Sequence, residues 1–240
     1  MYIQKKYIMR NSIDVEIYHS GRYGAPGMKR EKRKASPEDY TKWNYTQACK
    51  KLKRIINANF GPGDFSCTLT YRMDERPPDE DAKKEITNFL RRMSREYKKR
   101  GYTLKWIYTT EQRTKSIHHH LIVNSIPETA QLLTKHWKRG YIRVSILDNS
   151  GDYKALADYI IKETDKTFRD PASADRKRYS RSRNLIIPEA HKRLISAKTF
   201  RKDPKPHKGY YIDKDSIYRG DNPVTGYPYM TYTMIKIGGG

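Results

Sequence analysis

The chain has 240 residues, and its 50 Lys and Arg against 27 Asp and Glu give a formal net charge of +23. A charge this high favours phosphate polyanions as partners, with anionic membranes second. The membrane alternative is weakened because the chain has no run of about 18 apolar residues and begins without the apolar stretch of a secretion signal. The 20 tyrosines beside these cations suit stacking on nucleic-acid bases. We therefore expect a nucleic-acid partner and no membrane partner.

The first part of the chain, residues 1–60, is expected to be a basic N-terminal segment followed by a helix that packs on the core. Residues 13–18 have a strand-like pattern, and residues 29–34 form a basic run that is either a DNA-contacting arm or a solvated charged segment. Pro37 follows a Ser and precedes two acidic residues, which is typical of a helix start. The apolar stripe that follows predicts a helix that ends before Gly61.

The middle of the chain, residues 61–165, is expected to be the core domain. Apolar periodicity predicts strand, helix, strand, strand, helix, strand and a last helix. In that order these elements lie at about 65–71, 79–100, 104–111, 117–123, 128–137, 141–147 and 152–164. The helix at 79–100 has one apolar face for the core, formed by Ile86, Phe89, Leu90, Met93 and Tyr97. We predict an α+β fold with a central, mainly antiparallel sheet of about five strands and flanking helices.

The last part, residues 166–240, is expected to be a basic C-terminal extension packed on the same domain. It contains two apolar runs, at 185–187 and 227–237, and a turn signal precedes the second run. The chain has two cysteines, Cys49 in a helical pattern and Cys67 in a strand pattern. Both are expected to be reduced and buried, as in a cytosolic protein.

Three consecutive histidines in the strand at 117–123 decide the functional prediction. Side chains alternate along a strand, so His118 and His120 share one face, whereas His119 lies with the apolar residues that face the core. Two imidazoles at this spacing can bind one metal ion, although histidines in strands often only hydrogen-bond to neighbours. In the predicted hairpin, Glu111 ends its strand close to the start of the histidine strand, which supplies a carboxylate as a third ligand.

A second candidate group lies on the helix at 152–164. Tyr159 and Lys162 are three residues apart and therefore adjacent on the helix surface, beside its apolar stripe. Tyr-x-x-Lys recurs in this chain, so the motif alone is weak, and the alternative is a boundary tyrosine whose hydroxyl reaches water. Only this copy lies in a predicted helix that follows a His-x-His strand and one further strand.

Together these features resemble the HUH endonuclease superfamily, and within it the single-tyrosine rolling-circle replication initiators of small plasmids and phages. The resemblance rests on three motifs, the strand at 65–71, the histidine motif at 118–123 and the helix at 157–163. His119 departs from the family pattern, in which a hydrophobic residue usually occupies this position. The resemblance implies a ferredoxin/RRM-like HUH nuclease fold for residues 61–165, with N- and C-terminal additions.

The resemblance also implies a reaction and a role for each site residue. Tyr159 attacks a phosphodiester of single-stranded DNA at a rolling-circle origin, leaving a 5′-phosphotyrosine and a free 3′-OH, and the reverse reaction rejoins the strands. Glu111, His118 and His120 hold Mg²⁺ or Mn²⁺ as a Lewis acid, and Lys162 favours the phenolate. The chain has no G-x-x-x-x-G-K-[ST] motif, so the expected partners are single-stranded DNA or an origin hairpin and a host helicase and polymerase. The expected location is the cytoplasm of a bacterial or phage-infected cell.

Several alternatives stay open at the level of sequence. Arg113, Lys115, Arg181 and Arg183 are candidate phosphate contacts, although single basic residues are common on any surface. A transposase or mobilisation relaxase needs the same site as a replication initiator. A non-catalytic nucleic-acid-binding protein with structural histidines is another alternative. A non-haem iron or zinc enzyme with two histidines and a carboxylate is a further one, and the net charge argues against it.

Overall fold

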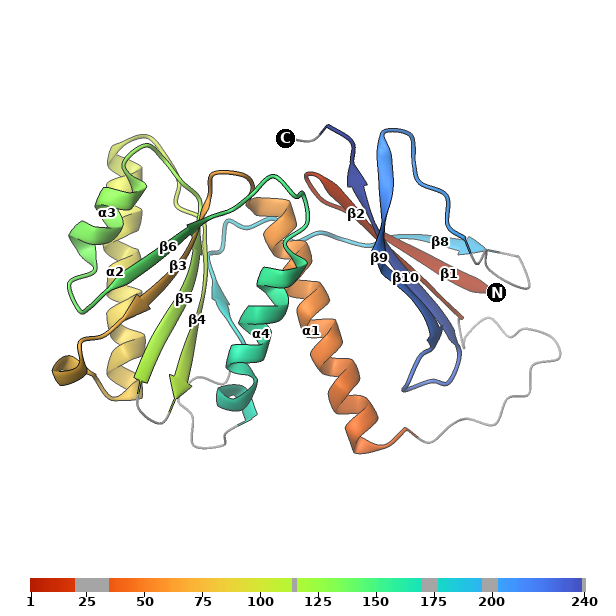
Figure 1. Cartoon of the computed structure of the whole chain (residues 1–240), viewed down its shortest axis with the longest axis horizontal. Coiled ribbons are helices and arrows are strands. Elements are labelled where there is room, and N and C mark those ends of the chain that lie inside the picture. The colour runs from red at the N-terminus through yellow and green to blue at the C-terminus, as the bar shows by residue number, and fades with distance from the viewer. Residues whose placement is uncertain (20–34, 114–115, 170–176, 196–202, 239–240) are drawn as a thin grey trace. The chain divides into compact units, whose positions relative to one another are not determined.

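The computed structural model describes residues 1–19, 35–113, 116–169, 177–195 and 203–238. The chain forms two compact units, whose elements are labelled in Figure 1. The histidine unit consists of Asn59–Asn149 and Ala155–Leu185, and the terminal unit of Met1–Ala58, Ser150–Lys154 and Ile186–Gly240. The expected division at residues 60 and 165 differs from this one, because residues from both ends of the chain share the terminal unit.

The histidine unit contains one antiparallel sheet with the strand order β6-β3-β5-β4-β7. Its elements are β3 (Phe65–Thr70), η1 (Met73–Glu75), α2 (Asp79–Lys99), β4 (Trp106–Arg113), β5 (Ser116–Val123), α3 (Thr129–His136), β6 (Ile142–Ile146), α4 (Lys154–Arg169) and β7 (Ser180–Arg181). The β-α-β-β-α-β order from β3 to β6 is that of a ferredoxin-like fold. The predicted α+β class and five-stranded antiparallel sheet are confirmed.

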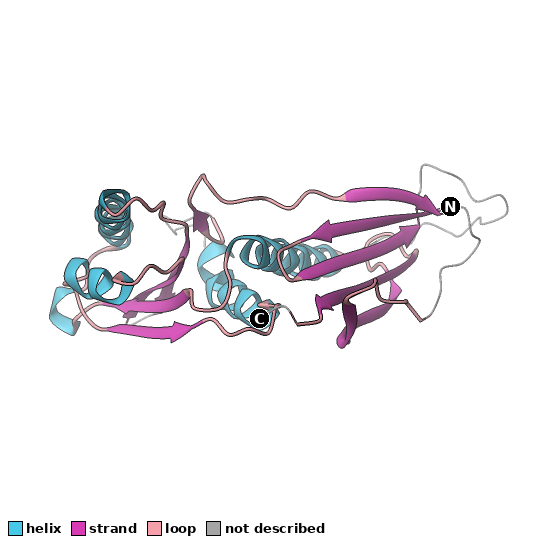
Figure 2. Cartoon of the chain, turned by 90° about the horizontal axis from the view of Figure 1, so that it is seen from above, coloured by secondary structure: helices cyan, strands magenta, loops and turns pink. Residues whose placement is uncertain are grey.

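Helices α2 and α3 lie on one face of this sheet and α4 lies on the other (Figures 1 and 2). The main core fills the α2 and α3 side, where Leu69 and Leu121 from the strands pack with Phe89 and Leu133 from the helices. All five residues of the predicted apolar face of α2 are buried. The 3.6-residue period therefore identified correctly which side of α2 packs on the sheet.

The predicted element ends differ from the observed ones mainly at the polar ends of β4 and α4. β4 was expected to end at Glu111 but continues to Arg113, whose backbone lies opposite Ser116 in β5. α4 was expected to end at Thr164 but continues to Arg169. These extensions carry polar residues, so an apolar pattern does not detect them, whereas backbone hydrogen bonds form regardless of side chain.

The terminal unit contains a second antiparallel sheet, with the strand order β8-β1-β2-β10-β9. Its elements are β1 (Tyr2–Ile8), β2 (Ser12–His19), α1 (Pro37–Asn59), β8 (His191–Ile195), β9 (Tyr210–Asp221) and β10 (Pro228–Lys236). The two ends of the chain pair directly in this sheet, with Val15 of β2 opposite Tyr232 of β10. This second sheet was not among the expected elements.

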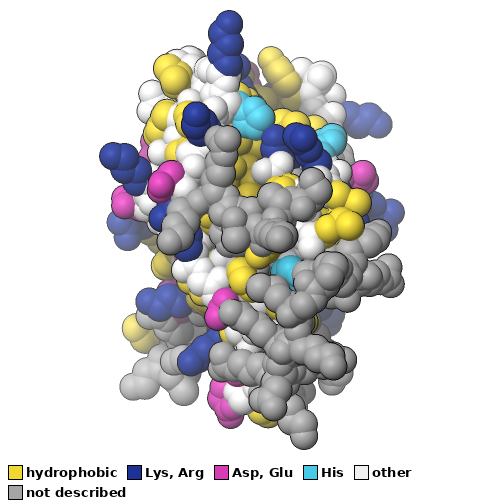
Figure 3. All heavy atoms as spheres, turned by 90° about the vertical axis from the view of Figure 1, so that its right-hand side faces the viewer, with side chains coloured by type: hydrophobic (Ala, Val, Ile, Leu, Met, Phe, Trp, Pro, Cys, Tyr) yellow, Lys and Arg dark blue, Asp and Glu magenta, His cyan; other side chains and the backbone are white. Residues whose placement is uncertain are grey.

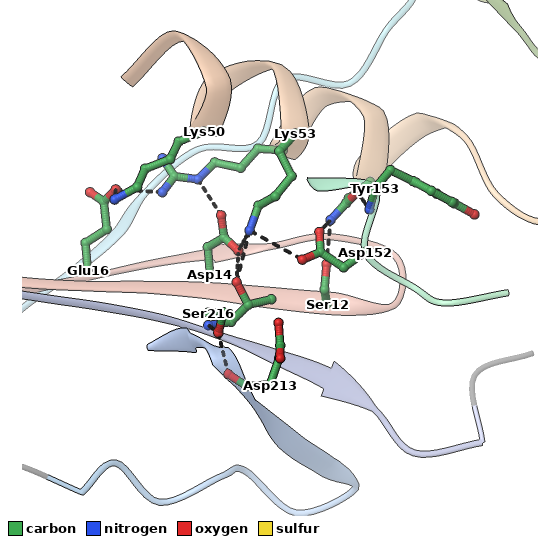
Figure 4. A network of polar contacts seen from close by, with 12 residues as sticks. Ser12, Asp14, Glu16, Lys50, Lys53, Asp152, Tyr153, Asp213 and Ser216 are labelled. Atoms are coloured by element: carbon green, nitrogen blue, oxygen red, sulfur yellow. Dashed lines mark hydrogen bonds and ion pairs between the residues drawn. The ribbon is translucent and has the colours of Figure 1, made fainter. Parts of the chain in front are cut away.

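Helix α1 is held on the second sheet by buried ion pairs (Figure 4). Nζ of Lys53 is 2.6 Å from Oδ1 of Asp14, and Nε of Arg54 is 2.9 Å from Oδ2 of the same residue. Nη2 of Arg54 is also 2.7 Å from Oε1 of Glu16. Burial alone raises the pKa of Asp14, but Lys53 and Arg54 outweigh this effect and hold the pKa below its ordinary value. The pairs thus keep a buried carboxylate charged.

The surface and the cysteines agree with the composition. Lys and Arg side chains are spread over the face shown in Figure 3. None of the described helices combines the length and apolar character that crossing a membrane requires. Cys49 and Cys67 are both buried, as predicted, and burial raises the pKa of the Cys67 thiol to about 12. The basic run that ends at residue 34 lies outside the described residues.

Candidate active site

The hairpin of β4 and β5 sets the register of the candidate site. Glu111 in β4 lies directly opposite His118 in β5. Directly opposed residues of an antiparallel pair share a face, and residues two apart in one strand do so as well. Glu111, His118 and His120 therefore lie on the face that α4 covers, and His119 lies on the face that α2 and α3 cover.

His119 is part of the core, as predicted. It has no exposed surface, and its ring lies edge-on to Tyr71 and Trp137. Its Nε2 is 2.9 Å from the Tyr71 hydroxyl, and its Nδ1 is 3.0 Å from Oγ1 of Thr110. Burial, with a smaller contribution from the two neighbouring histidines, lowers the pKa of His119 to about 3. A neutral imidazole with both nitrogens bonded can therefore occupy a position where the family usually has a hydrophobic residue.

Glu111 and His120 form a buried pair. Oε2 of Glu111 is 3.0 Å from Nε2 of His120, and the two residues are 3% and 6% exposed. Oγ1 of Thr68 in β3 is 3.4 Å from the other ring nitrogen, Nδ1. Two ligand atoms about 2.1 Å from one ion and at right angles are about 3 Å apart. The spacing of this pair fits both a direct hydrogen bond and two adjacent ligand positions of a metal ion.

The third predicted ligand, His118, is half-buried on the same face. Across the described ranges, no group of three or more His, Cys, Asp or Glu side chains is arranged to hold a metal ion. The structure therefore brings Glu111 and His120 into contact, and the three-ligand set stays a prediction.

Tyr159 of α4 lies against His120. The two ring centroids are 5.2 Å apart and the ring planes are at 86°, an edge-to-face contact. Tyr159 is 45% exposed, so a bound substrate can reach it. The predicted nucleophile and one of the predicted metal ligands thus lie on the same side of the sheet.

A pocket of about 310 Å³ lies where α4 meets the sheet, and both His120 and Tyr159 line it. Arg143 of β6 also lines this pocket. Thr68 lies opposite both His120 and Arg143, so these three side chains form a row across β5, β3 and β6. A guanidinium in this row is suited to hold a phosphate next to Tyr159.

Arg143 was not among the residues predicted from the sequence. The alternation of β6 shows only that Arg143 and Ser145 share a face. Which face that is, and which residues lie beside them, depends on the pairing of β6 with β3, and a sequence pattern contains no signal for that pairing.

The remaining predicted site residues lie outside this pocket. Lys162 is exposed about one turn after Tyr159 on α4 and does not line the pocket. Arg181 and Arg183 are exposed and line a groove on the opposite face of the sheet. Lys115 and the side chain of Arg113 lie outside the described residues.

The comparisons with known proteins point to DNA replication. Residues 64–168 match the model of a family described as Replication-associated protein ORF2. No curated protein and no solved structure matches the chain significantly. The matched range contains every residue of the site described above, namely Thr68, Glu111, His118, His120, Arg143, Tyr159 and Lys162. The similarity to a replication-associated family therefore covers the candidate active site and not the strands of the terminal unit.

Proposed function

We propose that this chain is a replication initiator that nicks and rejoins single-stranded DNA at a rolling-circle origin, with Tyr159 as its nucleophile. The proposal depends on one observation: Tyr159 from α4 lies against the buried pair of Glu111 and His120, and Arg143 lines the same pocket. The match of this region to a replication-associated family supports the proposal.

A divalent metal ion belongs to the proposal. Glu111 and His120 would hold Mg²⁺ or Mn²⁺, and His118 would become the third ligand after rotation of its side chain, because β5 already places it opposite Glu111. A mixed set of imidazole and carboxylate accepts Mn²⁺, and Mg²⁺ when waters and substrate oxygens complete the octahedron. The bound ion would supply Lewis-acid polarisation of the scissile phosphate.

The chemical step uses the residues around the pocket. The Tyr159 oxygen forms a bond to phosphorus as the bond to the 3′-oxygen breaks, which gives a 5′-phosphotyrosine and a 3′-OH. The phenol loses one proton and the departing 3′-oxygen gains one. A free phenol has a pKa near 10, so a nearby cation such as Lys162 promotes its ionisation. Arg143 pairs with the non-bridging oxygens as charge develops on them. Attack by a 3′-OH on the phosphotyrosine reverses the step and rejoins DNA.

The test uses a pool of random single-stranded oligonucleotides, because the preferred sequence is unknown. Incubation with the full chain and Mn²⁺ should give a covalent adduct that survives denaturation and migrates more slowly than the free protein. Tyr159→Phe and chelation of the metal should each abolish the adduct. Tyr102→Phe is the matched control, because Tyr102 is also exposed and also begins a Tyr-x-x-Lys sequence. An adduct that persists in Tyr159→Phe would refute the assignment of the nucleophile.

The same experiment distinguishes the alternatives. Sequencing the attached DNA identifies an origin, as proposed, or the end of a mobile element, which would indicate a transposase or relaxase. The direct hydrogen bond between Glu111 and His120 also favours a second candidate, a nucleic-acid-binding protein with structural histidines. That candidate predicts salt-dependent DNA binding without any adduct. As an initiator, the protein would act in the cytoplasm of a bacterial or phage-infected cell, with a host helicase and polymerase.

A further inference from the structure

A second groove in the histidine unit lies on the sheet face opposite to Tyr159. It has a volume of about 730 Å³ and lies between α2 and the strands β4 and β7. We call it the β4–β7 groove. Its main lining side chains are Arg91, Arg95, Trp106, Tyr179, Arg181 and Arg183. Trp106 lies opposite Val123, which belongs to the core under α2, so the groove is on the α2 face of the sheet.

The β4–β7 groove is strongly basic. Lys177 also lines it, which makes five cations, and no Asp or Glu is among its lining residues. None of these five cations forms an ion pair with a carboxylate in the described ranges of the chain. The adjacent Arg178, by contrast, pairs with Asp165 at 2.7 Å and does not line the groove. Like charges that converge without counterions attract a polyanion.

Aromatic side chains lie among these cations. Trp106 is half-buried, and its ring centroid is 5.4 Å from that of Tyr108, with the ring planes tilted by 32°. Tyr179 is also half-buried in the lining, and burial raises the pKa of its phenol. Rings beside arginines are the combination that binds single strands, because unpaired bases stack on the rings while phosphates contact the cations. A duplex keeps its bases stacked inside and has none to offer to the rings.

We propose that the β4–β7 groove binds a second stretch of single-stranded DNA. Arg91 and Arg95 contact its phosphates, and a base stacks on Trp106 or Tyr179. The choice of DNA over RNA rests on the proposed function, whereas the presence of a single-strand site does not. Because the groove is on the other face of the sheet from Tyr159, DNA bound there flanks the cleaved position. Loss of the groove should therefore weaken substrate binding and leave the cleavage of bound DNA nearly unchanged.

The binding test measures fluorescence anisotropy of a labelled oligothymidylate of about ten nucleotides over a range of KCl concentrations. The double variant Arg91→Ala/Arg95→Ala should bind more weakly, and the slope of log affinity against log salt should become shallower by about 1.4, because each contact with a single strand contributes about 0.7. Tyr179→Leu should weaken binding about 5- to 100-fold without changing this slope. The control Lys51→Ala/Lys98→Ala removes two exposed helical cations that lie outside the groove and should leave the slope nearly unchanged.

Photocrosslinking with a 5-iododeoxyuridine oligonucleotide gives an independent readout. Crosslinked peptides should contain Trp106 or Tyr179. The inference is overturned if the groove variants bind with the affinity and salt slope of the wild type and crosslinks map only to the α4 face. Stronger competition by oligouridylate than by oligothymidylate would overturn the choice of DNA. If the Tyr159 adduct never forms but the groove variants still weaken binding, the proposed nicking function fails and the groove stands.

Discussion

The buried charges between α1 and β2 allow a quantitative test of the terminal unit. Lys53→Met removes an ammonium that is 2.6 Å from Oδ1 of Asp14 and 2.9 Å from Oγ1 of Thr233, and it keeps most of the side-chain volume. Asp14 is only 3% exposed, so water cannot replace the lost partner. Arg54 remains 2.9 Å from the other carboxylate oxygen and limits the damage.

Removing one partner of a buried ion pair typically costs about 3–5 kcal/mol. Because Arg54 still compensates part of the charge on Asp14, we expect Lys53→Met to reduce the free energy of unfolding by about 2–4 kcal/mol. In the double variant Lys53→Met/Asp14→Asn the carboxylate is no longer charged. The double variant should therefore lose at least about 1 kcal/mol less than the sum of the two single variants.

The assay is urea unfolding followed by tryptophan fluorescence. Trp43 on α1 reports on the terminal unit, where it lies 5.4 Å from the ring of Tyr229, whereas Trp106 and Trp137 lie in the histidine unit. Comparison with Trp43→Phe identifies the transition that belongs to the terminal unit. The matched control is Lys51→Met, an exposed lysine on the same helix, which should change stability by less than about 0.5 kcal/mol. Equal stability of the Lys53 and Lys51 variants, or additivity in the double variant, would refute the reasoning.

Three further predictions concern single residues. Burial lowers the pKa of Lys50 from 10.5 to about 8, so between these values the unfolded state holds a proton that the native state has lost, and stability should rise by up to about 1.4 kcal/mol per pH unit. Urea unfolding at pH 8 and pH 10 should show this rise in the wild type and a smaller one in Lys50→Met. Arg143→Ala should slow adduct formation about 100-fold, with partial recovery in Arg143→Lys, and single-turnover kinetics would show an unchanged rate if Arg143 does not contact the phosphate. His119→Leu should cost about 1–3 kcal/mol in urea unfolding, because the buried Tyr71 hydroxyl loses its partner, while adduct formation persists; loss of the adduct in a folded variant would contradict a purely structural role.

The histidine unit could be predicted because its information is local. An apolar stripe marks α2, and alternation marks β3 and β5, so each element is visible within its own residues. Alternation within β5 is also sufficient to separate His119 from His118 and His120. The proximity of Glu111 to this strand followed from the hairpin, whose connection is short.

The terminal unit could not be predicted because its information is not local. β2 pairs with β10, near the opposite end of the chain, and no pattern within either strand identifies the other. The cations of α1 show the same problem. In the sequence, Lys53 and Arg54 simply lie opposite the apolar stripe of their helix, and their burial becomes understandable only once β2 supplies Asp14 as a partner.

His119 connects the fold to the site, since its two hydrogen bonds fix the register of three chain segments. Oγ1 of Thr110 in β4 contacts one ring nitrogen, and the hydroxyl of Tyr71, directly after β3, contacts the other. A slip of one residue in β5 would turn His118 and His120 toward the core and move them away from Glu111, because side chains alternate with a period of two. A hydrophobic residue at position 119 would fill the same space without bonding to either neighbour. The departure from the family pattern at this position therefore favours the one register in which His120 meets Glu111 on the face of the sheet that also carries Tyr159.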